Sequence, residues 1–421
     1  MSIRPVPPQR AWRSPLRGPW LTSVLASVLL VGLLVMVVTG LLSYAAYDPR
    51  LGGSNDQTPQ AGLLASWIAF DWPTSPAWLY RVNQGLHVTL GLALVPIVLA
   101  KLWSVAPKLF AWPPVKSPAH ALERLSILLL VGSILFLMLT GTMNVQYDYA
   151  FGFSFYTGHF YAAWVFIAAF ATHVFLKLPT MVRSLRDRPF GAELRTSTAD
   201  TVAEPVDPHG LVSPDPAPAT ISRRGALAVV GGSSLAVLAM SVGQTIDPLR
   251  RTALLAPRGQ VTGDGPNDFP VNTTFREIGI DETETGSSWR LRLVGPSGER
   301  ALRRDELLTM ELRTEDLPIA CVEGWSASRS WTGVRLRDLA ALVGGEDADS
   351  VLVESLQRGG AFSTMQLTDS QLRADRTLLA LKVNGVDLSL DHGFPARMII
   401  PAAPGVRNTK WVSTLTFRSG S

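Results

Sequence analysis

Apolar residues gather in five long stretches of the first 245 residues, and the rest of the chain changes between apolar and polar positions over short distances. A helix needs about 20 apolar residues to cross roughly 30 Å of hydrocarbon. Four stretches meet that length, and the fifth is shorter and rich in Gly and Ser. The pattern predicts membrane-spanning helices over residues 20–46, 82–103, 125–145 and 160–178, and a fifth anchor or signal helix over 227–242.

The part after residue 245 has the pattern of a soluble domain. Residues 289–294 predict a strand followed by a turn, and a helix is expected to begin at Leu336. Residues 378–383 predict a strand that ends in Asn384-Gly385, a typical hairpin turn. The predicted fold class is an all-α transmembrane bundle of four helices plus a fifth anchor or signal helix, followed by an α+β domain. That domain contains no dinucleotide fingerprint, P-loop or nucleophile elbow.

The positions of Lys and Arg predict the orientation. The N-terminal tail carries four arginines and no acid, and the connection between the second and third helices and the end of the fourth helix are also basic. The positive-inside rule places these segments in the cytoplasm. The sequence thus predicts a cytoplasmic tail at 1–19, a membrane domain at 20–185, a disordered cytoplasmic linker at 186–221, a signal and fifth helix at 222–245, and an extracytoplasmic domain at 246–421. This topology accounts for much of the net charge of +4 without nucleic-acid binding.

Paired arginines precede the fifth apolar stretch, in Ser222-Arg223-Arg224-Gly225. They resemble an internal twin-arginine export signal, a route that exports folded proteins with their cofactors inserted. They fit equally well as the cytoplasmic anchor of the fifth helix. Both interpretations predict a multi-pass protein of a bacterial cytoplasmic membrane, with its C-terminal domain on the extracytoplasmic side.

Three of the six histidines lie in the predicted spanning helices or directly at the start of one, where ionisable side chains are costly and usually functional. His87 and His159 each lie within about two turns of the start of an inward-running helix. We therefore expect both near the outer face, at a depth where two imidazoles can ligate one haem iron. His173 follows His159 by fourteen residues, which returns to nearly the same helix face about 21 Å deeper. A hydrogen-bonded interhelical histidine is the alternative for His173.

Two histidines on one helix resemble the four-helix cytochrome b subunits of respiratory formate dehydrogenases and hydrogenases. The resemblance implies an outer haem b between His87 and His159, and an inner haem at His173. The inner partner should come from the start of the first helix, but residues 17–23 contain no histidine. His120 is a substitute candidate, and Lys101 occupies the position on the second helix that a two-haem layout gives to histidine. One haem is predicted, and a second is left open.

The chain has one cysteine, which excludes an intrachain disulfide and a cysteine-rich metal site. A lone cysteine after an apolar run is usually a small buried hydrophobe. Here the string Ile319-Ala320-Cys321-Val322-Glu323-Gly324-Trp325-Ser326 resembles the cysteine motif of the sulfite-oxidase superfamily. The resemblance implies that the Cys321 thiolate ligates molybdenum beside a molybdopterin, and a soft thiolate suits such a centre.

A second segment, Asp391-His392-Gly393-Phe394-Pro395-Ala396-Arg397 followed by Lys410-Trp411-Val412, matches the C-terminal block of that superfamily. The resemblance places His392 beside the pterin, and Arg397 and Lys410 at its phosphate. The interval from Cys321 to Trp331 looks more like the bacterial periplasmic protein-methionine-sulfoxide reductases, which use a separate haem b membrane partner. In that family an asparagine faces the metal centre, and Asn272 is the nearest candidate.

These features predict a membrane-bound molybdopterin oxidoreductase that passes electrons between the quinone pool, haem b and an extracytoplasmic molybdenum centre, reducing a small-molecule or protein sulfoxide. Cys321 would be the metal ligand and not a nucleophile. One alternative is an oxidase of sulfite or another small donor that runs electrons inward. Another is a non-catalytic electron-transfer or sensing membrane protein. The sequence predicts no oligomeric state.

Overall fold

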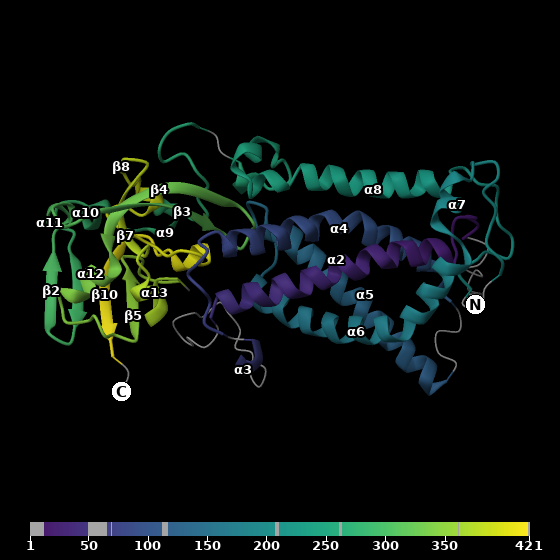
Figure 1. The fold of residues 1–421 in the computed structure, drawn as a ribbon, viewed down its shortest axis with the longest axis horizontal. Coiled ribbons are helices and arrows are strands. Elements are labelled where there is room, and N and C mark those ends of the chain that lie inside the picture. The colour runs from purple at the N-terminus through teal and green to yellow at the C-terminus, as the bar shows by residue number, and fades with distance from the viewer. Residues whose placement is uncertain are drawn as a thin grey trace, which may run out of the picture. The chain divides into compact units, whose positions relative to one another are not determined.

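The computed structural model describes residues 12–48, 65–68, 70–111, 117–206, 210–260, 263–360 and 362–419. The chain divides into two compact units. One comprises residues up to 37 together with 90–142 and 158–239, and the other comprises residues 38–89, 143–157 and 240–421. Several long helices contribute residues to both units (Figure 1).

The predicted long helices are confirmed. They are α2 (Pro19–Ala46), α4 (Leu79–Leu109), α5 (Pro118–Asn144), α6 (Phe155–Asp187) and α8 (Arg223–Ala239). Among the described residues, these five helices are long and apolar enough to cross a membrane, which indicates membrane association. Most extend beyond the predicted apolar stretches, because polar residues at their ends continue the backbone hydrogen-bond pattern that hydrocarbon requires.

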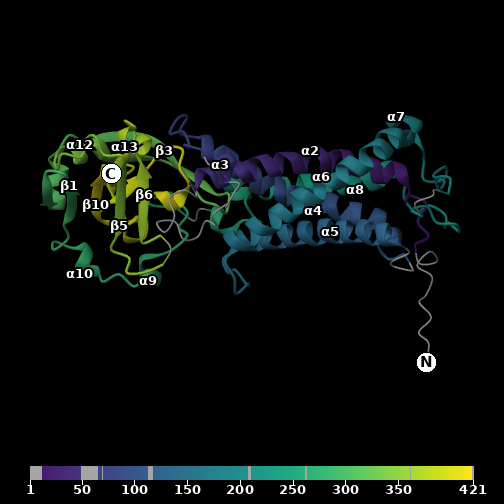
Figure 2. The ribbon, with the colours of Figure 1, turned by 90° about the horizontal axis from the view of Figure 1, so that it is seen from below.

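The first unit is a helix bundle. Parts of α2, α4, α5 and α6 run along a common direction (Figures 1 and 2), and their apolar faces share one core. The buried members of this core are Leu29, Leu33, Leu94, Val98, Ile134, Phe166 and Phe170. The histidines, lysines and hydroxyl groups discussed below interrupt an otherwise apolar surface.

The segment predicted as a disordered linker makes buried contacts with the bundle. It contains α7 (Phe190–Arg195), where Glu193 forms a 3.0 Å ion pair with Arg223 at the start of α8. The Glu204 carboxylate accepts a hydrogen bond from Trp20 N–H in the first turn of α2. Arg223 of the arginine pair is buried and Arg224 is exposed, so the first arginine is held by the fold.

The second unit contains the α+β domain, as predicted. One sheet has the order β2-β1-β10-β5-β6, in which β1 and β10 pair in parallel and the other neighbours are antiparallel. The other sheet has the order β3-β4-β7-β8, and β9 also pairs with β7. The strands are β1 (Leu291–Gly295), β2 (Gly298–Leu302), β3 (Arg313–Ala320), β4 (Ser326–Arg335), β5 (Ser350–Ser355), β6 (Thr364–Thr368), β7 (Leu378–Val383), β8 (Val386–Asp387), β9 (Arg397–Ile399) and β10 (Val412–Arg418).

Short helices connect these strands and the membrane segments. They are α3 (Ala65–Ile68), α9 (Phe275–Ile278), α10 (Glu282–Thr285), α11 (Arg304–Leu308), α12 (Leu336–Ala341) and α13 (Asp369–Arg373), with 3-10 turns that include η3 (Val242–Gln244), η4 (Asp247–Thr252), η6 (Leu390–His392) and η7 (Gly405–Arg407). The predicted hairpin is also present, because Asn384 and Gly385 both have positive φ and join β7 to β8.

Candidate functional site

Cys321 lies in the loop of the β3–β4 hairpin. Ala320 at the end of β3 pairs with Ser326 at the start of β4, and the residues between them form the loop. Cys321 N–H donates to Trp325 O (2.8 Å), and Gly324 N–H donates to Cys321 O (3.0 Å). Gly324 has a φ of +92°, which side chains rarely adopt. A glycine is therefore required for the chain to turn back so soon after the cysteine.

The C-terminal block packs against the apolar cluster that contains Cys321. The ring of His392 stacks on Phe269 with 3.5 Å between centroids. The guanidinium of Arg397, the first residue of β9, lies 5.7 Å from the ring centroid of Trp331. Phe269, Trp331 and Cys321 all belong to the same buried cluster. The structure therefore brings His392 and Arg397 into the neighbourhood of Cys321, as the sequence motif predicts.

Lys410 completes this group. Its ammonium donates hydrogen bonds to the backbone oxygens of Thr273 and Asp391. It also interacts electrostatically with Arg397 and Cys321. Four residues predicted from two separate motifs thus lie within interaction range in the second unit.

Burial shifts the pKa values of these residues. It lowers the pKa of Lys410 to about 7, with a further contribution from the nearby Arg397. It lowers the pKa of Arg397 to about 10 and the pKa of His392 to about 3, and it raises the pKa of the Cys321 thiol well above its usual value. The carboxylates of Asp391 and Glu277 offset part of the positive charge of Lys410. Two buried cations of this kind favour an anionic ligand.

Unpartnered polar atoms mark where such a ligand would bond. Arg397 Nε, Asn408 Nδ2 and Thr409 Oγ1 are buried and have no hydrogen-bond partner. Buried polar groups normally have partners, so these three donors indicate a polar ligand. Their position in the segment that leads to Lys410 fits the phosphate and polar rim of a molybdopterin, and Cys321 supplies a sulfur ligand for its metal.

Asn272 borders the site through its backbone. Its side chain is exposed, its carbonyl accepts a 2.7 Å hydrogen bond from Arg258 Nη1, and the next residue accepts from Lys410. Arg258 was not predicted from the sequence. Its guanidinium lies 3.8 Å from the carboxylate of Glu323 in the cysteine loop, and burial raises the pKa of that carboxyl to about 7 against the opposing effect of Arg258.

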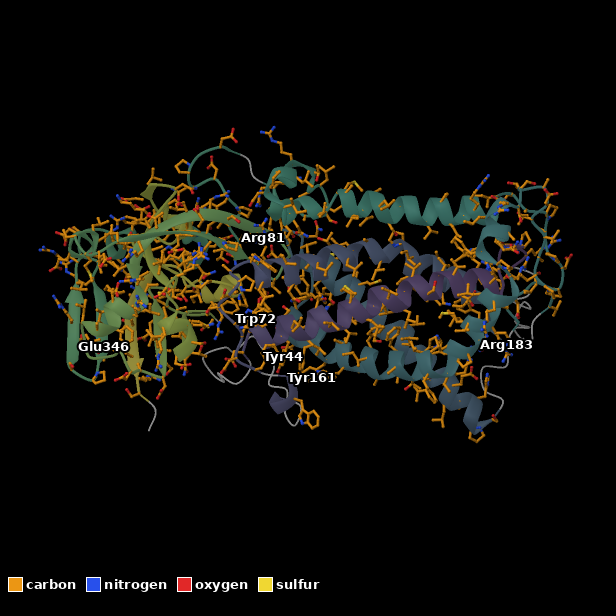
Figure 3. All side chains as sticks on the ribbon, in the orientation of Figure 1. Tyr44, Trp72, Arg81, Tyr161, Arg183 and Glu346 are labelled. Atoms are coloured by element: carbon orange, nitrogen blue, oxygen red, sulfur yellow. The ribbon has the colours of Figure 1, made fainter. Side chains whose placement is uncertain are left out.

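The segment before α4 and the first turns of α4 belong to the same unit as the α+β domain. They form hydrogen bonds with that domain, and Figure 3 labels two of the side chains involved, Trp72 and Arg81. Three side chains donate to the domain: Trp72 Nε1 to Ala402 O (2.7 Å), Arg81 Nη1 to Ser328 Oγ (2.8 Å) and Gln84 Nε2 to Val322 O (2.6 Å). Gln84 Oε1 in turn accepts from Ser43 Oγ at the end of α2 (2.7 Å). Both ends of the Gln84 amide are therefore fixed, and its N–H group holds the residue next to Cys321.

Apolar packing strengthens this contact. A Cβ placed on Gly324 would lie 2.8 Å from Val88 Cβ, so the cysteine loop and α4 approach as closely as the missing side chain allows. His87 lies between Gln84 and Val88 on the same helix. The predicted haem ligand is therefore on the helical turn that contacts the loop of the predicted molybdenum ligand.

Three tyrosines from the ends of the long helices also surround this loop. Tyr47, Tyr80 and Tyr156 are each electrostatically coupled to the Cys321 thiol, and Tyr47 and Tyr80 pack in a cluster with Ala320. The sequence did not identify them as site residues, because tyrosines at the ends of apolar helices are typical of a membrane interface.

His87 and His159 have matching surroundings, each within its own unit. Thr39 Oγ1 lies 2.9 Å from His87 Nδ1, and a Cβ on Gly40 would lie 3.1 Å from the same ring. On the other histidine, Thr140 Oγ1 lies 3.1 Å from His159 Nδ1, and a Cβ on Gly141 would lie 3.8 Å from Cε1 of the same ring. A threonine hydroxyl thus lies at Nδ1 of each imidazole, and the glycine that follows it lies nearest the ring carbon Cε1.

The remaining predicted histidines lie apart from these pairs. His173 lines a cavity in the first unit together with Lys101. His120 is in the first turn of α5, and its backbone N–H bonds to Ser117 Oγ. No group of three or more His, Cys, Asp or Glu side chains that could hold a metal ion occurs among the described residues.

Comparisons with known proteins agree with the site. Residues 278–421 match the family described as "Oxidoreductase molybdopterin binding domain". A provisionally named protein-methionine-sulfoxide reductase subunit, YedZ1, of Azospira oryzae is 28% identical over 187 residues, which cover 43% of this chain and 68% of that protein. Mitochondrial sulfite oxidase of Mus musculus is 33% identical over 216 residues, which cover 41% of this chain and 38% of the oxidase.

Among solved structures, the sulfane dehydrogenase SoxCD of Paracoccus pantotrophus is similar over 32% of this chain and 39% of its own, with 22% identity and a TM-score of 0.29. The chain spans well under half of mouse sulfite oxidase, so the similarity concerns a domain and not the whole oxidase. Residues 278–421 of this chain are a molybdopterin-binding oxidoreductase domain, a module of an enzyme family whose members include sulfite oxidases.

Proposed function

We propose that the chain is a membrane-bound molybdenum oxidoreductase that passes electrons between the quinone pool, haem b and an extracytoplasmic molybdenum–pterin centre, and that it reduces a sulfoxide-type acceptor such as methionine sulfoxide. The printed name of the Azospira oryzae relative, a subunit of a protein-methionine-sulfoxide reductase, supports this substrate class. The five apolar helices support the membrane location. The extracytoplasmic side follows from the distribution of Lys and Arg.

The observation that carries the proposal is the contact between α4 and the cysteine loop. Gln84 bonds to the carbonyl of Val322, which follows Cys321 directly. His87 is less than one helical turn from Gln84. A haem held at His87 would therefore be connected to the molybdenum ligand through one helix turn and one hydrogen bond.

The residues of the site have distinct roles in this function. When bound, molybdenum–pterin supplies two-electron oxygen-atom transfer and haem supplies one-electron transfer. Cys321 would hold the metal through its sulfur, and Arg397 and Lys410 would bond to the pterin phosphate as charged donors. His392, buried and with a pKa of about 3, stays neutral near pH 7 and can act as a hydrogen-bond partner beside the pterin without adding charge.

The haem ligands would be His87 and His159. Their shared Thr-Gly surroundings support the assignment, because a hydroxyl at Nδ1 fixes the imidazole tautomer, and a glycine leaves space beside the ring.

The test is a redox-dependent absorption spectrum of the purified chain, with molybdenum and iron quantified on the same sample. We expect one molybdenum per chain and a b-type spectrum on reduction with dithionite. Cys321→Ser should lose molybdenum and keep the haem spectrum, whereas His87→Ala should lose the haem spectrum and keep molybdenum. Wild-type protein without molybdenum, or a b-type spectrum that survives His87→Ala unchanged, would refute the respective assignment.

A second function is favoured by the 33% identity to mouse sulfite oxidase. An oxidase of sulfite or a similar small donor would send electrons in the opposite direction, from the molybdenum centre to haem and quinone. One measurement distinguishes the two directions of electron flow. Methionine sulfoxide should oxidise the reduced haem if the chain is a reductase, and sulfite should reduce the oxidised haem if it is an oxidase.

A further inference from the structure

A cavity of about 240 Å³ lies within the first unit, between α2, α4, α5 and α6. Its walls are almost entirely apolar and include Leu29, Leu33, Val98, Ile134, Phe166 and Phe170. These side chains belong to the bundle core. An apolar cavity inside a membrane bundle is accessible to lipid-soluble molecules and favours an apolar ring or chain.

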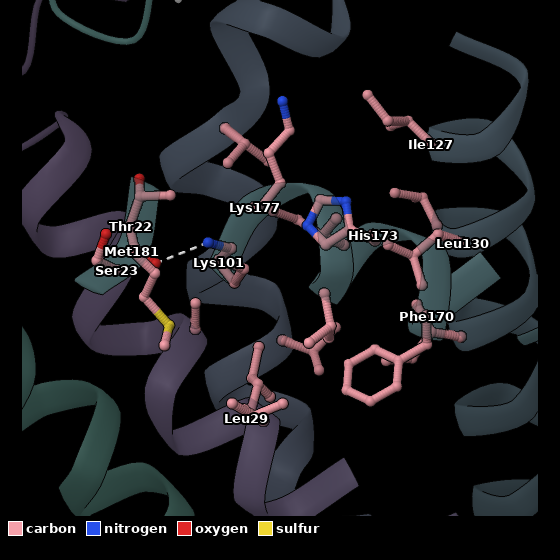
Figure 4. Close-up of a pocket in the computed structure, with 18 of the residues that line it drawn as sticks. Thr22, Ser23, Leu29, Lys101, Ile127, Leu130, Phe170, His173, Lys177 and Met181 are labelled. Atoms are coloured by element: carbon pink, nitrogen blue, oxygen red, sulfur yellow. Dashed lines mark hydrogen bonds between the residues drawn. The ribbon is translucent and has the colours of Figure 1, made fainter. Parts of the chain in front are cut away.

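The cavity has one polar end. Lys101 projects into it from α4 and His173 from α6, so that the ammonium and the imidazole approach the space from two helices (Figure 4). Lys101 Nζ donates one hydrogen bond to Thr22 O (2.7 Å), and an ammonium has three donors. Two polar side chains of this type in hydrocarbon are costly and usually serve a ligand.

A cluster of charged side chains lies at the same end. Lys177, one helical turn after His173, also lines the cavity, and its ammonium lies 3.5 Å from the carboxylate of Glu123 on α5. Lys108 lies 3.1 Å from the same carboxylate. Glu123 and Lys177 are both about one-third exposed. The polar end of the cavity is therefore bordered by charged groups that reach the protein surface.

We propose that this cavity is the binding site for the head group of a lipid-soluble quinone. The ring would lie against the apolar wall, and its two carbonyl oxygens would accept hydrogen bonds from Lys101 and His173. This inference deepens the function proposed above, because it gives the quinone pool a defined place on the chain.

The chemistry balances with the haem of the proposed function as the electron acceptor. Oxidation of a quinol breaks its two O–H bonds and yields the quinone, two electrons and two protons. The electrons leave one at a time to haem b. The two protons pass to water at this end of the cavity, while Lys101 stays bonded to the carbonyl oxygen that forms.

The main competing occupant is a second haem at His173. Among the described residues that line the cavity, His173 is the only imidazole. Lys101 donates to a backbone carbonyl, as an ammonium does, and an ammonium has no lone pair for iron. The donor set therefore fits a ligand with oxygen acceptors better than it fits a metal porphyrin.

The test uses the full-length chain in detergent and decylubiquinone as the probe, with binding measured by isothermal titration calorimetry. Lys101→Met and His173→Gln should each weaken binding about ten-fold or more, because each removes a hydrogen bond to the ring oxygens. Lys101→Arg keeps a donor and should bind more tightly than Lys101→Met. Lys382→Met on β7 and His120→Gln on α5 are matched controls outside the cavity, and both should bind as the wild type does.

A separate measurement distinguishes failure of this site from failure of the proposed function. Reduction with dithionite reports haem in every variant without using quinone. If Lys101→Met and His173→Gln keep the haem spectrum and bind decylubiquinone with unchanged affinity, the cavity is not the quinone site. If His173→Gln lowers the haem content per chain, a second haem occupies the cavity and the proposal is wrong. If the wild type contains no haem, the proposed function fails, and the titrations still decide whether the cavity binds quinone.

One further variant covers the case in which loss of Lys101 or His173 prevents folding. Ala26 lines the cavity from α2, and Ala26→Phe fills it while both polar side chains remain. This variant should also weaken decylubiquinone binding about ten-fold or more. Unchanged binding in well-folded Ala26→Phe would overturn the proposal.

Discussion

Gly324→Ala tests the contact between the cysteine loop and α4. The φ of Gly324 is +92°, and this backbone conformation costs about 1–2 kcal/mol for a residue with a Cβ. The new Cβ would also lie 2.8 Å from Val88 Cβ, 3.0 Å from Val88 Cγ1 and 3.0 Å from Gln244 Nε2, the end of a flexible side chain. Overpacking of this kind costs about 1–3 kcal/mol. We therefore expect a loss of about 2–5 kcal/mol in the free energy of unfolding of the second unit.

A control separates the backbone cost of Gly324→Ala from its overpacking cost. Gly385 has a similar φ of +82° and no atom within 4 Å of its Cβ position, so Gly385→Ala should show the backbone cost alone. Val88→Gly removes both crowded carbons of Val88, and it costs about 1 kcal/mol as a helix-interior glycine. The double variant Gly324→Ala with Val88→Gly should be more stable than the sum of its single variants predicts, by about 1–3 kcal/mol.

The assay is urea unfolding of the detergent-solubilised chain, followed by tryptophan fluorescence and paired with molybdenum content. Gly324→Ala should lower both stability and molybdenum, because the loop that carries Cys321 must move. A Gly324→Ala protein as stable as Gly385→Ala would show that the loop does not press on α4. Strict additivity in the double variant would refute the packing argument even if both single variants are unstable.

Three further predictions use other contacts of the site. In the cofactor-free chain, burial lowers the pKa of Lys410 from 10.5 in the unfolded state to about 7 in the folded state, so only the unfolded state holds the proton between these pH values. The free energy of unfolding should therefore rise by about 3–4 kcal/mol from pH 7 to 10. Lys410→Met should remove this rise, measured by urea unfolding at pH 7.5 and 9.5. Trp72→Phe leaves the carbonyl of Ala402 without its 2.7 Å donor and should cost about 1–3 kcal/mol in the same assay. Thr39→Val removes the hydroxyl at His87 Nδ1 and should weaken haem retention by about 10- to 100-fold, measured by haem release to apomyoglobin, whereas Thr39→Ser should retain it.

Local patterns in the sequence predicted the parts of the fold that local forces determine. The five apolar stretches became helices because hydrocarbon requires internal backbone hydrogen bonds. Asn384-Gly385 became a hairpin turn because both residues tolerate positive φ. The group formed by Cys321, His392, Arg397 and Lys410 was predicted from motif resemblance, and the structure places these residues in one region.

Contacts between distant segments could not be predicted in this way. Nothing in the local pattern indicates that Arg292 on β1 pairs in parallel with Thr414 on β10. The composition of the linker suggested disorder, because average polarity does not show that Glu204 has a buried partner at Trp20. The sequence shows the spacing of His87 and Lys101. It does not show that Lys101 lines the same cavity as His173.

The contact of α4 with the cysteine loop gives the fused chain a physical advantage over two separate proteins. A separate haem subunit must find and orient its partner in every encounter, whereas here Gln84 and Val88 belong to the chain that carries Cys321. Linking two modules raises their effective concentration and removes this association step. The partly buried bond from Gln84 to Val322 also restrains the rotation of the first turns of α4 about the helix axis. Because His87 is on the same turn of that helix, the same bond also helps to orient the predicted haem ligand, so one shared contact positions the predicted haem ligand and the predicted molybdenum ligand.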